Sequence, residues 1–150
     1  MAIITVESKP FISNPVRVNG KSLWTGRILS GLGVAFLTMD AVVKVLQLPV
    51  AVENTVRLGY PSGVVLGLGL IQLALLALYL VPRTSVLGTV LLTGYLDGAV
   101  ATHVRIGNPL FSHVLFPIYV AGLLWLGLWL RDRQLRTLLP FGSARPGSVR

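Results

Sequence analysis

Four apolar stretches, separated by short segments that contain proline and glycine, dominate this 150-residue sequence. Each comes near or reaches the length of about 20 residues that an α-helix needs to cross the hydrocarbon core of a bilayer. Proline ends or opens several of them, because it breaks a helix interior but fits the first turn of a helix. The pattern predicts four membrane-spanning helices over about residues 24–48, 62–81, 85–104 and 114–130.

The composition excludes an ordinary soluble domain. Hydrophobic residues make up 53% of the chain and charged residues 12%, which is about half the charged fraction of an average soluble protein. The basic residues lie between and beyond the apolar stretches instead of forming a patch, which argues against nucleic-acid binding. The sequence has no cysteine, which excludes disulfide exchange, iron–sulfur ligation and thiolate zinc sites within this chain.

The distribution of basic residues predicts which way the helices cross the membrane. With four spans both ends lie on one side, and cytoplasmic segments carry an excess of Lys and Arg. Ten basic residues fall on the side of the chain ends and three on the other side. We therefore predict an all-α membrane protein, a four-transmembrane-helix bundle with both termini cytoplasmic. It would comprise a cytoplasmic arm over residues 1–22, a transmembrane domain over 23–131 and a cytoplasmic tail over 132–150.

Small residues indicate where helices can approach one another. Gly63 and Gly67 lie four residues apart in the second predicted span, and Gly94 and Gly98 do so in the third. Such pairs form flat helix faces that suit close helix–helix contacts in membranes.

Ionisable residues in or beside the spans are the candidates for function. Placing a charged side chain near the bilayer centre costs about 3 kcal/mol of free energy on insertion scales, so such a residue is expected to be paired, solvated or functional. Asp40 precedes Lys44 by four residues, which predicts an ion pair on one helix face. The alternating direction of the spans places all the candidates in the outer half of the bilayer, where we expect a polar pocket open to the outer side. The ligand-binding or proton-handling candidates are Asp40, Lys44, Asp97, His103 and His113.

Asp97 differs from Asp40 because no basic residue lies one helical turn away. We expect it to be buried, and burial without a close cation favours the neutral acid. A structural hydrogen bond at a helix contact and a role in proton or substrate handling are both open for Asp97. For Asp40 and Lys44 the alternatives are a structural pair that fixes helix register and a functional one.

The two histidines, His103 and His113, flank a short loop between antiparallel spans, as a bis-histidine haem site requires. A zinc site would need Asp97 or Glu53 as a third ligand. With so few ligands we expect no metal and no haem. The sequence shows no nucleophile constellation and no phosphate-binding loop, so catalytic residues stay unassigned and enzymatic activity stays open.

Three short segments resemble the DoxX-like family of small bacterial membrane proteins. They are Met39-Asp40 with Lys44, the loop over residues 57–61 (Arg-Leu-Gly-Tyr-Pro), and Gly98-Ala99 with Thr102-His103. The resemblance covers about residues 23–130. It implies a four-helix fold in the cytoplasmic (inner) membrane and a link to quinone-dependent oxidoreductases, whose sulfur chemistry does not carry over to a chain without cysteine.

Three functional hypotheses follow. The first is an accessory integral-membrane subunit of a redox or quinone-linked complex, with an outer-half pocket for a quinone-like or lipid molecule. The second is a stand-alone membrane enzyme or small-molecule carrier that transfers protons through Asp40, Asp97 and His103. The third is an assembly or scaffold protein whose buried charges only fix helix packing. Besides the lipid bilayer, the partners considered are membrane or redox subunits and a second copy of the chain.

Overall fold

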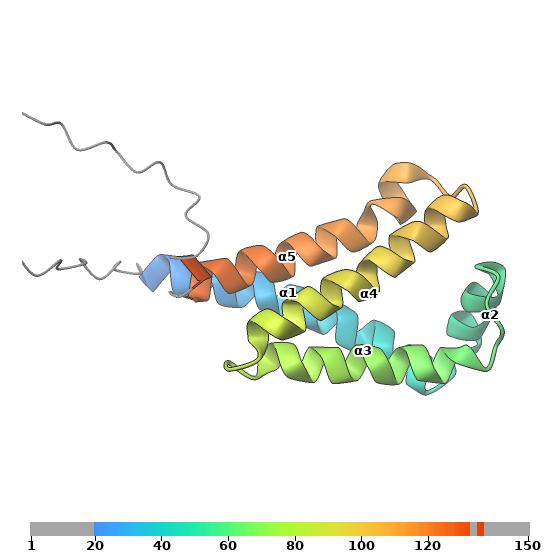
Figure 1. The fold of residues 1–150 in the computed structure, drawn as a ribbon, viewed down its shortest axis with the longest axis horizontal. Helices are drawn as coiled ribbons and strands as arrows, with labels where there is room; N and C mark the ends of the chain where they lie inside the picture. The colour runs from blue at the N-terminus through green and yellow to red at the C-terminus, as the bar shows by residue number, and fades with distance from the viewer. Residues whose placement is uncertain (1–19, 133–134, 137–150) are drawn as a thin grey trace, which may run out of the picture.

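The computed structural model describes residues 20–132 and 135–136 (Figure 1). The predicted cytoplasmic arm and tail lie almost wholly outside these described residues. The described part is helical and contains no strand. Its elements are α1 (Gly20–Val45), α2 (Pro49–Arg57), α3 (Val64–Leu80), α4 (Ser85–Arg105), the π-helical turn η1 (Leu110–Val114) and α5 (Phe116–Arg131).

The helix boundaries follow the sequence prediction closely except between the first two spans. α1 ends at Val45, and Gln47 turns the chain with a positive φ of 50°. Pro49 then opens the short helix α2 at its first position, where a missing N–H is harmless. This segment lies between the first two predicted spans, and its nine residues are too few to give a strong helical periodicity.

Three of the described helical segments are long and apolar enough to cross a membrane. They are Gly20–Val45, Ser85–Arg105 and the continuous stretch Leu110–Arg131, and α3 is a shorter apolar helix of 17 residues. Within residues 20–132 and 135–136, the structure therefore confirms the predicted all-helical class and its membrane-compatible helices.

The four long helices pack in a ring in which α1 and α4 each contact α3 and α5. α1 begins and α5 ends at one end of the molecule, where a tight turn over residues 81–84 also joins α3 to α4 (Figure 1). We call this the closed end. α2 and the connection over residues 106–109 lie at the opposite end, where the helices diverge (Figure 1). We call this the open end.

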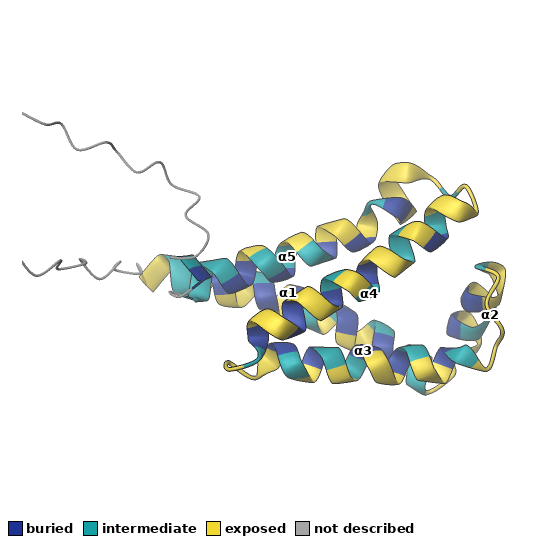
Figure 2. Ribbon diagram, viewed as in Figure 1, coloured by how far each residue is buried: buried dark blue, intermediate teal, exposed yellow. Residues whose placement is uncertain are grey.

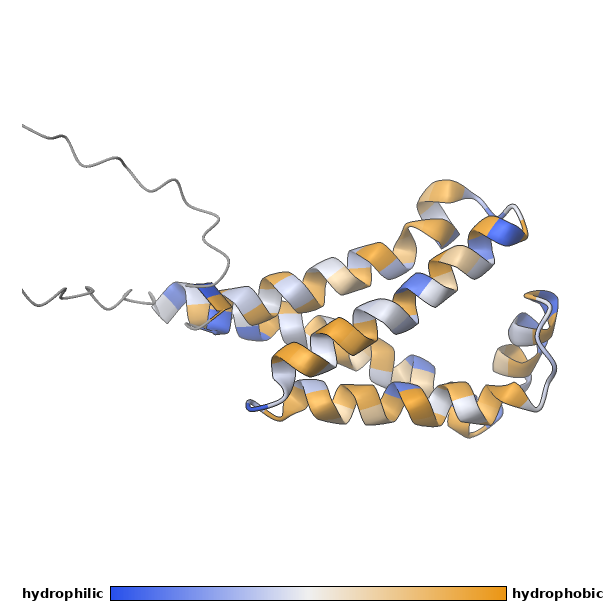
Figure 3. Cartoon of the chain, in the orientation of Figure 1, coloured by the Kyte–Doolittle hydropathy of each residue, from blue (hydrophilic) through white to orange (hydrophobic). Residues whose placement is uncertain are grey.

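The outside of the described helices is apolar, unlike the surface of a soluble protein. Buried faces line the inside of the ring, and exposed faces cover the outside of every long helix (Figure 2). Large apolar side chains are exposed on these outer faces, which are strongly hydrophobic (Figure 3). Polar side chains such as Gln72, Thr89 and Ser30 are buried instead. Because lipid cannot hydrogen-bond them, membrane helices turn polar groups toward one another.

Hydrogen bonds between these buried side chains link neighbouring helices. The Tyr79 hydroxyl on α3 donates to Ser30 Oγ on α1 at 2.8 Å and approaches the Leu124 carbonyl of α5 at 3.3 Å. The Trp125 ring nitrogen on α5 donates to Thr93 Oγ1 on α4 at 2.9 Å. All four long helices are therefore cross-linked by polar contacts within the core.

Close helix approaches occur at glycines other than the two predicted pairs. A Cβ added at Gly63, Gly67, Gly94 or Gly98 would meet nothing within 4 Å. No described helix packs on those faces, so the prediction of close contacts there is wrong for the part of the chain that the structure describes. Another helix does approach closely at Gly26, Gly33, Gly69, Gly88 and Gly127.

Gly88 provides a test of this packing. An added Cβ there would overlap the backbone of Leu78 and Tyr79 on α3, and backbone cannot move aside as a flexible side chain can. We expect Gly88→Ala to lower stability by about 1–3 kcal/mol, the usual cost of overpacking. Gly67→Ala is the matched control, because its methyl group enters open space and helix propensity favours alanine. Thermal midpoints in mild detergent should fall for the first variant only, and equal midpoints would contradict the packing.

Candidate functional site

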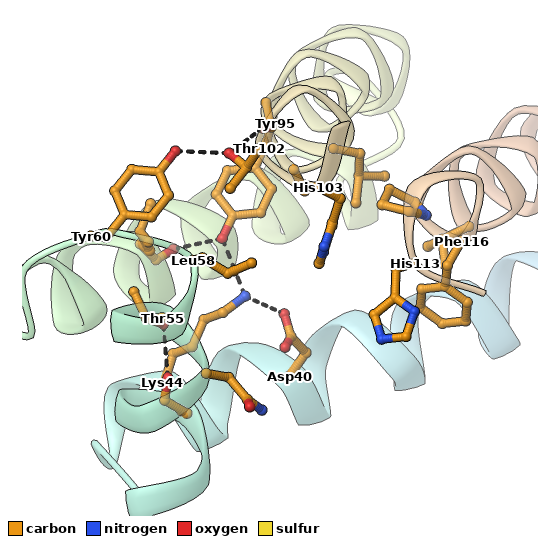
Figure 4. A pocket seen from close by; sticks show the side chains of 18 of the residues that line it. Asp40, Lys44, Thr55, Leu58, Tyr60, Tyr95, Thr102, His103, His113 and Phe116 are labelled. Carbon is orange, nitrogen blue, oxygen red and sulfur yellow. Dashed lines mark hydrogen bonds and ion pairs between the residues drawn. The ribbon is translucent and has the colours of Figure 1, made fainter. Parts of the chain in front are cut away.

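A cavity of about 970 Å³ opens between the diverging helices at the open end of the ring. Its wall comes mainly from α1, α2, α4 and the η1–α5 segment, with Leu68 from α3. Apolar side chains such as Phe36, Met39 and Val120 form much of the lining. The polar lining residues gather in two places, a network on the α1 side and a group at the rim (Figure 4).

The polar network centres on Lys44. Its ammonium nitrogen lies 2.5 Å from Asp40 Oδ2, 3.0 Å from Gln72 Oε1 and 3.4 Å from the Tyr95 hydroxyl. Tyr95 also donates to Gln72 Oε1 at 3.0 Å, and the Gln72 amide donates to the Leu37 carbonyl at 2.9 Å. The ammonium thus has three acceptors from α1, α3 and α4. The predicted Asp40–Lys44 ion pair is confirmed, and it is part of a larger network that joins three helices.

A second set of contacts ties the loop after α2 to α4 at the rim. The Thr102 hydroxyl donates to the Gly98 carbonyl at 2.8 Å, so the Tyr60 hydroxyl donates to Thr102 Oγ1, also at 2.8 Å. The Arg105 guanidinium donates to the Leu58 carbonyl at 2.7 Å. Gly59 adopts a φ of +85°, a conformation that favours glycine. These contacts fix one wall of the cavity.

His103 and His113 meet on the opposite side of the rim. Their ring centres are 5.7 Å apart and both rings line the cavity (Figure 4). Asn108 Nδ2 lies 2.6 Å from His103 Nδ1, and Ser112 Oγ lies 2.8 Å from His113 Nδ1. The Asn108 amide donates to His103, so a neutral His103 ring carries its proton on Nε2. That N–H is a hydrogen-bond donor that no other described residue engages.

The structure brings four of the five predicted site residues to the cavity and leaves Asp97 out. Asp97 is exposed on the outer face of α4 and does not line the cavity. The expectation that it is buried is therefore wrong for the single chain. Its position follows from helix geometry, since the buried residues Leu92, Leu96 and Thr102 lie on the other side of α4.

Sequence reasoning missed the network partners Gln72 and Tyr95 and the rim residue Tyr60. Gln72 is the only polar side chain in a span built from Gly, Val, Leu, Ile, Ala and Tyr. That isolation was a usable signal, because a lone amide in an apolar helix must find a partner. Whether Gln72 lies at the same depth as Lys44 depends on how far α1 and α3 are shifted along their axes relative to each other. A single sequence does not reveal this shift.

Groups of three or more His, Cys, Asp or Glu that could hold a metal ion are absent from the part of the chain that the structure describes. His103 and His113 therefore have no third ligand of these types among the described residues.

A sequence model of the DoxX-like family matches residues 28–127. The chain belongs to the DoxX-like family. The match confirms the resemblance seen in the sequence, and with the apolar helices it identifies a small membrane protein. No curated protein and no solved structure matches the chain.

The DoxX-like match runs from α1 into α5 and includes both polar parts of the cavity. The three segments that carried the resemblance are far apart in sequence, yet each contributes to the cavity wall. Asp40 and Lys44 come from the first, Tyr60 from the second and His103 from the third. The segments that carried the resemblance therefore converge on one place in the fold.

The Asp40–Lys44 pair can be tested by a double-mutant cycle. Breaking a buried pair from one side costs about 3–5 kcal/mol, and the Asp40 side chain is 37% exposed, which points to the lower end of this range. We expect Asp40→Asn and Lys44→Met each to lower the thermal midpoint in mild detergent. The double variant should lose less than the sum of the two single losses.

The Glu53–Arg57 pair on α2 is the control cycle. It has the same spacing, but its atoms are 3.9 Å apart and its side chains are 67% and 77% exposed. Exposed pairs of this kind contribute about 0–1 kcal/mol. Glu53→Gln and Arg57→Met should therefore be additive, and additive losses at Asp40 and Lys44 would show that those two residues are not coupled.

Proposed function

We propose that this DoxX-like protein is an accessory subunit of the cytoplasmic membrane that holds a quinone-like or lipid molecule in its open-end cavity. The observation that carries the proposal is the cavity itself. It combines about 970 Å³ of volume, an apolar lining and a few convergent polar groups, which is the usual construction of a small-molecule site. We further propose that its ligand serves a redox partner in the same membrane.

The chemistry at the rim favours a ligand with a carbonyl oxygen. The hydroxyls of Tyr60 and Tyr95 already donate to Thr102 and Gln72. The His103 ring lines the cavity (Figure 4), and its Nε2–H is a donor that no other described residue engages. A quinone carbonyl or a lipid ester would accept this hydrogen bond while its apolar part lies against Phe36 and Met39. An aliphatic chain alone would leave the donor unsatisfied.

The rival hypothesis is an enzyme or carrier that moves protons through Asp40, Asp97 and His103. It has less support, because Asp97 lies outside the cavity that contains the other two. Asp40 is also held by Lys44 in an ion pair that ties it to the polar network. The scaffold hypothesis has less support as well, because a protein that only fixes helix packing does not need a cavity of about 970 Å³.

Quinone retention tests the proposed function. The full-length protein, purified gently from native membranes, should carry a quinone or lipid that organic extraction and mass spectrometry identify. We expect His103→Leu to lower the amount bound severalfold. His103→Gln should keep most of it, because the glutamine amide places a donor near the position of Nε2. Absence of any bound molecule, or equal binding by both variants, would contradict the proposal.

The same proposal includes four membrane crossings with both chain ends in the cytoplasm, so that the cavity opens to the outer side. The excess of basic residues on the side of the chain ends supports this orientation. A reporter active only outside the cytoplasm should be inactive when fused after Arg150. It should be active when inserted between residues 50 and 59. The opposite pattern would reverse the orientation and place the cavity opening in the cytoplasm.

A further inference from the structure

One oxygen of the Asp40 carboxylate is left without a partner among the described residues. The Lys44 ammonium contacts Oδ2 at 2.5 Å, and no described group donates to Oδ1. The side chain is 37% exposed and lines the cavity. As the partner of an ammonium group, Asp40 is an ionised carboxylate, which accepts hydrogen bonds and donates none. Its Oδ1 is therefore a charged acceptor that is open to a ligand in the cavity.

The wall across the ring from this carboxylate offers a donor. α1 and α4 each contact α3 and α5, so they lie on opposite sides of the ring. The hydroxyls of Tyr60 and Tyr95 already donate to Thr102 and Gln72, so neither is free to donate to a ligand. His103 on α4 keeps its Nε2–H and lines the same cavity (Figure 4). The cavity thus combines a free charged acceptor on α1 with a free donor on α4.

Aromatic side chains form a large part of the cavity lining. The rings of Phe36 and Phe116 meet edge to face with centres 5.0 Å apart, and those of His103 and His113 do so at 5.7 Å. Tyr95 also belongs to the lining. Contacts between aromatic rings are stabilised beyond the effect of the area that they bury. The lining therefore favours a ligand with an aromatic ring over one with only aliphatic groups.

We propose that the cavity binds a lipophilic phenol of the hydroquinone type, with one hydroxyl donating to Asp40 Oδ1 and the other oxygen accepting from His103 Nε2–H. This inference rests on the proposed function and names the ligand class of the same site. A hydroquinone carries both groups on one ring. Its oxidised form, a quinone, has two carbonyl oxygens and no donor, so it leaves the carboxylate unpaired. Asp40 is therefore the residue that selects the reduced form.

The charge of the carboxylate determines how strong this selection is. A hydrogen bond to a charged group stabilises a complex more than a hydrogen bond between neutral groups does. A ligand that displaces water from a polar atom without replacing its hydrogen bond loses affinity. Both effects favour the hydroquinone at Asp40 Oδ1. We expect the reduced form to bind roughly tenfold to a hundredfold more tightly than the oxidised form.

Calorimetry with matched probes tests the selection in the full-length protein, in mild detergent and without oxygen. The probes are decylhydroquinone, its oxidised form decylbenzoquinone, and its dimethyl ether, which keeps the ring and both oxygens but has no donor. Decylhydroquinone should bind most tightly of the three. It should also bind more tightly than dioleoylglycerol, a hydroxylated lipid without an aromatic ring. Equal affinities, or tighter binding of the quinone or the lipid, would overturn this inference and leave the proposed function standing. Failure of all four to bind would overturn it too, and the molecule extracted from native membranes then decides the proposed function.

Substitution of Asp40 isolates the carboxylate. In Asp40→Asn the ratio of the hydroquinone and quinone affinities should fall close to one, because an amide can donate to a carbonyl oxygen. The double variant Asp40→Asn with Lys44→Met repeats the measurement without an unpaired ammonium. A ratio within one variant does not depend on how stable that variant is. Glu53→Gln removes an exposed carboxylate outside the cavity lining and should keep the native ratio. A native ratio in both Asp40 variants would overturn the role of Asp40.

Discussion

One ammonium group determines how the open half of this fold is organised. Lipid cannot solvate Lys44, so its charge must be satisfied from within the chain. Asp40 supplies the counter-charge from the same helix, while Gln72 and Tyr95 supply further acceptors from α3 and α4. Satisfying the charge therefore fixes the depth and rotation of three helices relative to one another. The apolar contacts around the network favour no single alignment of the helices as strongly, because Leu and Val pack similarly in many registers.

Residue size explains why a cavity forms above this network. At the closed end, Gly26 and Gly127 let α1 and α5 approach almost backbone to backbone, and Gly88 does the same for α4 against α3. Nearer the open end, α1 stays close to α3 at Gly69, whereas the rings of Phe36 and Phe116, with centres 5.0 Å apart, lie between α1 and α5. Helices held together at one end and kept apart at the other must diverge. The cavity therefore lies where these large rings separate α1 from α5, and the rim contacts of the loop after α2 keep its wall in place.

The sequence predicted the helices and the ion pair well because both depend on local spacing. Length and hydropathy defined the apolar helices, and the four-residue interval identified Asp40 with Lys44. The partners Gln72 and Tyr95 depend on the offset between helices, which arises only from packing. The error at Asp97 has a different cause. An acid in an apolar span was expected to face the bundle, as most do, but the helical phase set by the buried residues of α4 turns it outward.

The two acids within the long described helices, Asp40 and Asp97, differ in their surroundings. Asp40 lies inside the ring with a cation one turn away, so its cost is met within the fold and its carboxyl borders a cavity. Asp97 has no such cation and lies on an outer face built from small and apolar residues. Packing of the described helices against one another does not relieve the cost at Asp97. The fold therefore treats its two acids differently, with Asp40 satisfied inside the ring and Asp97 left on the outer face of α4.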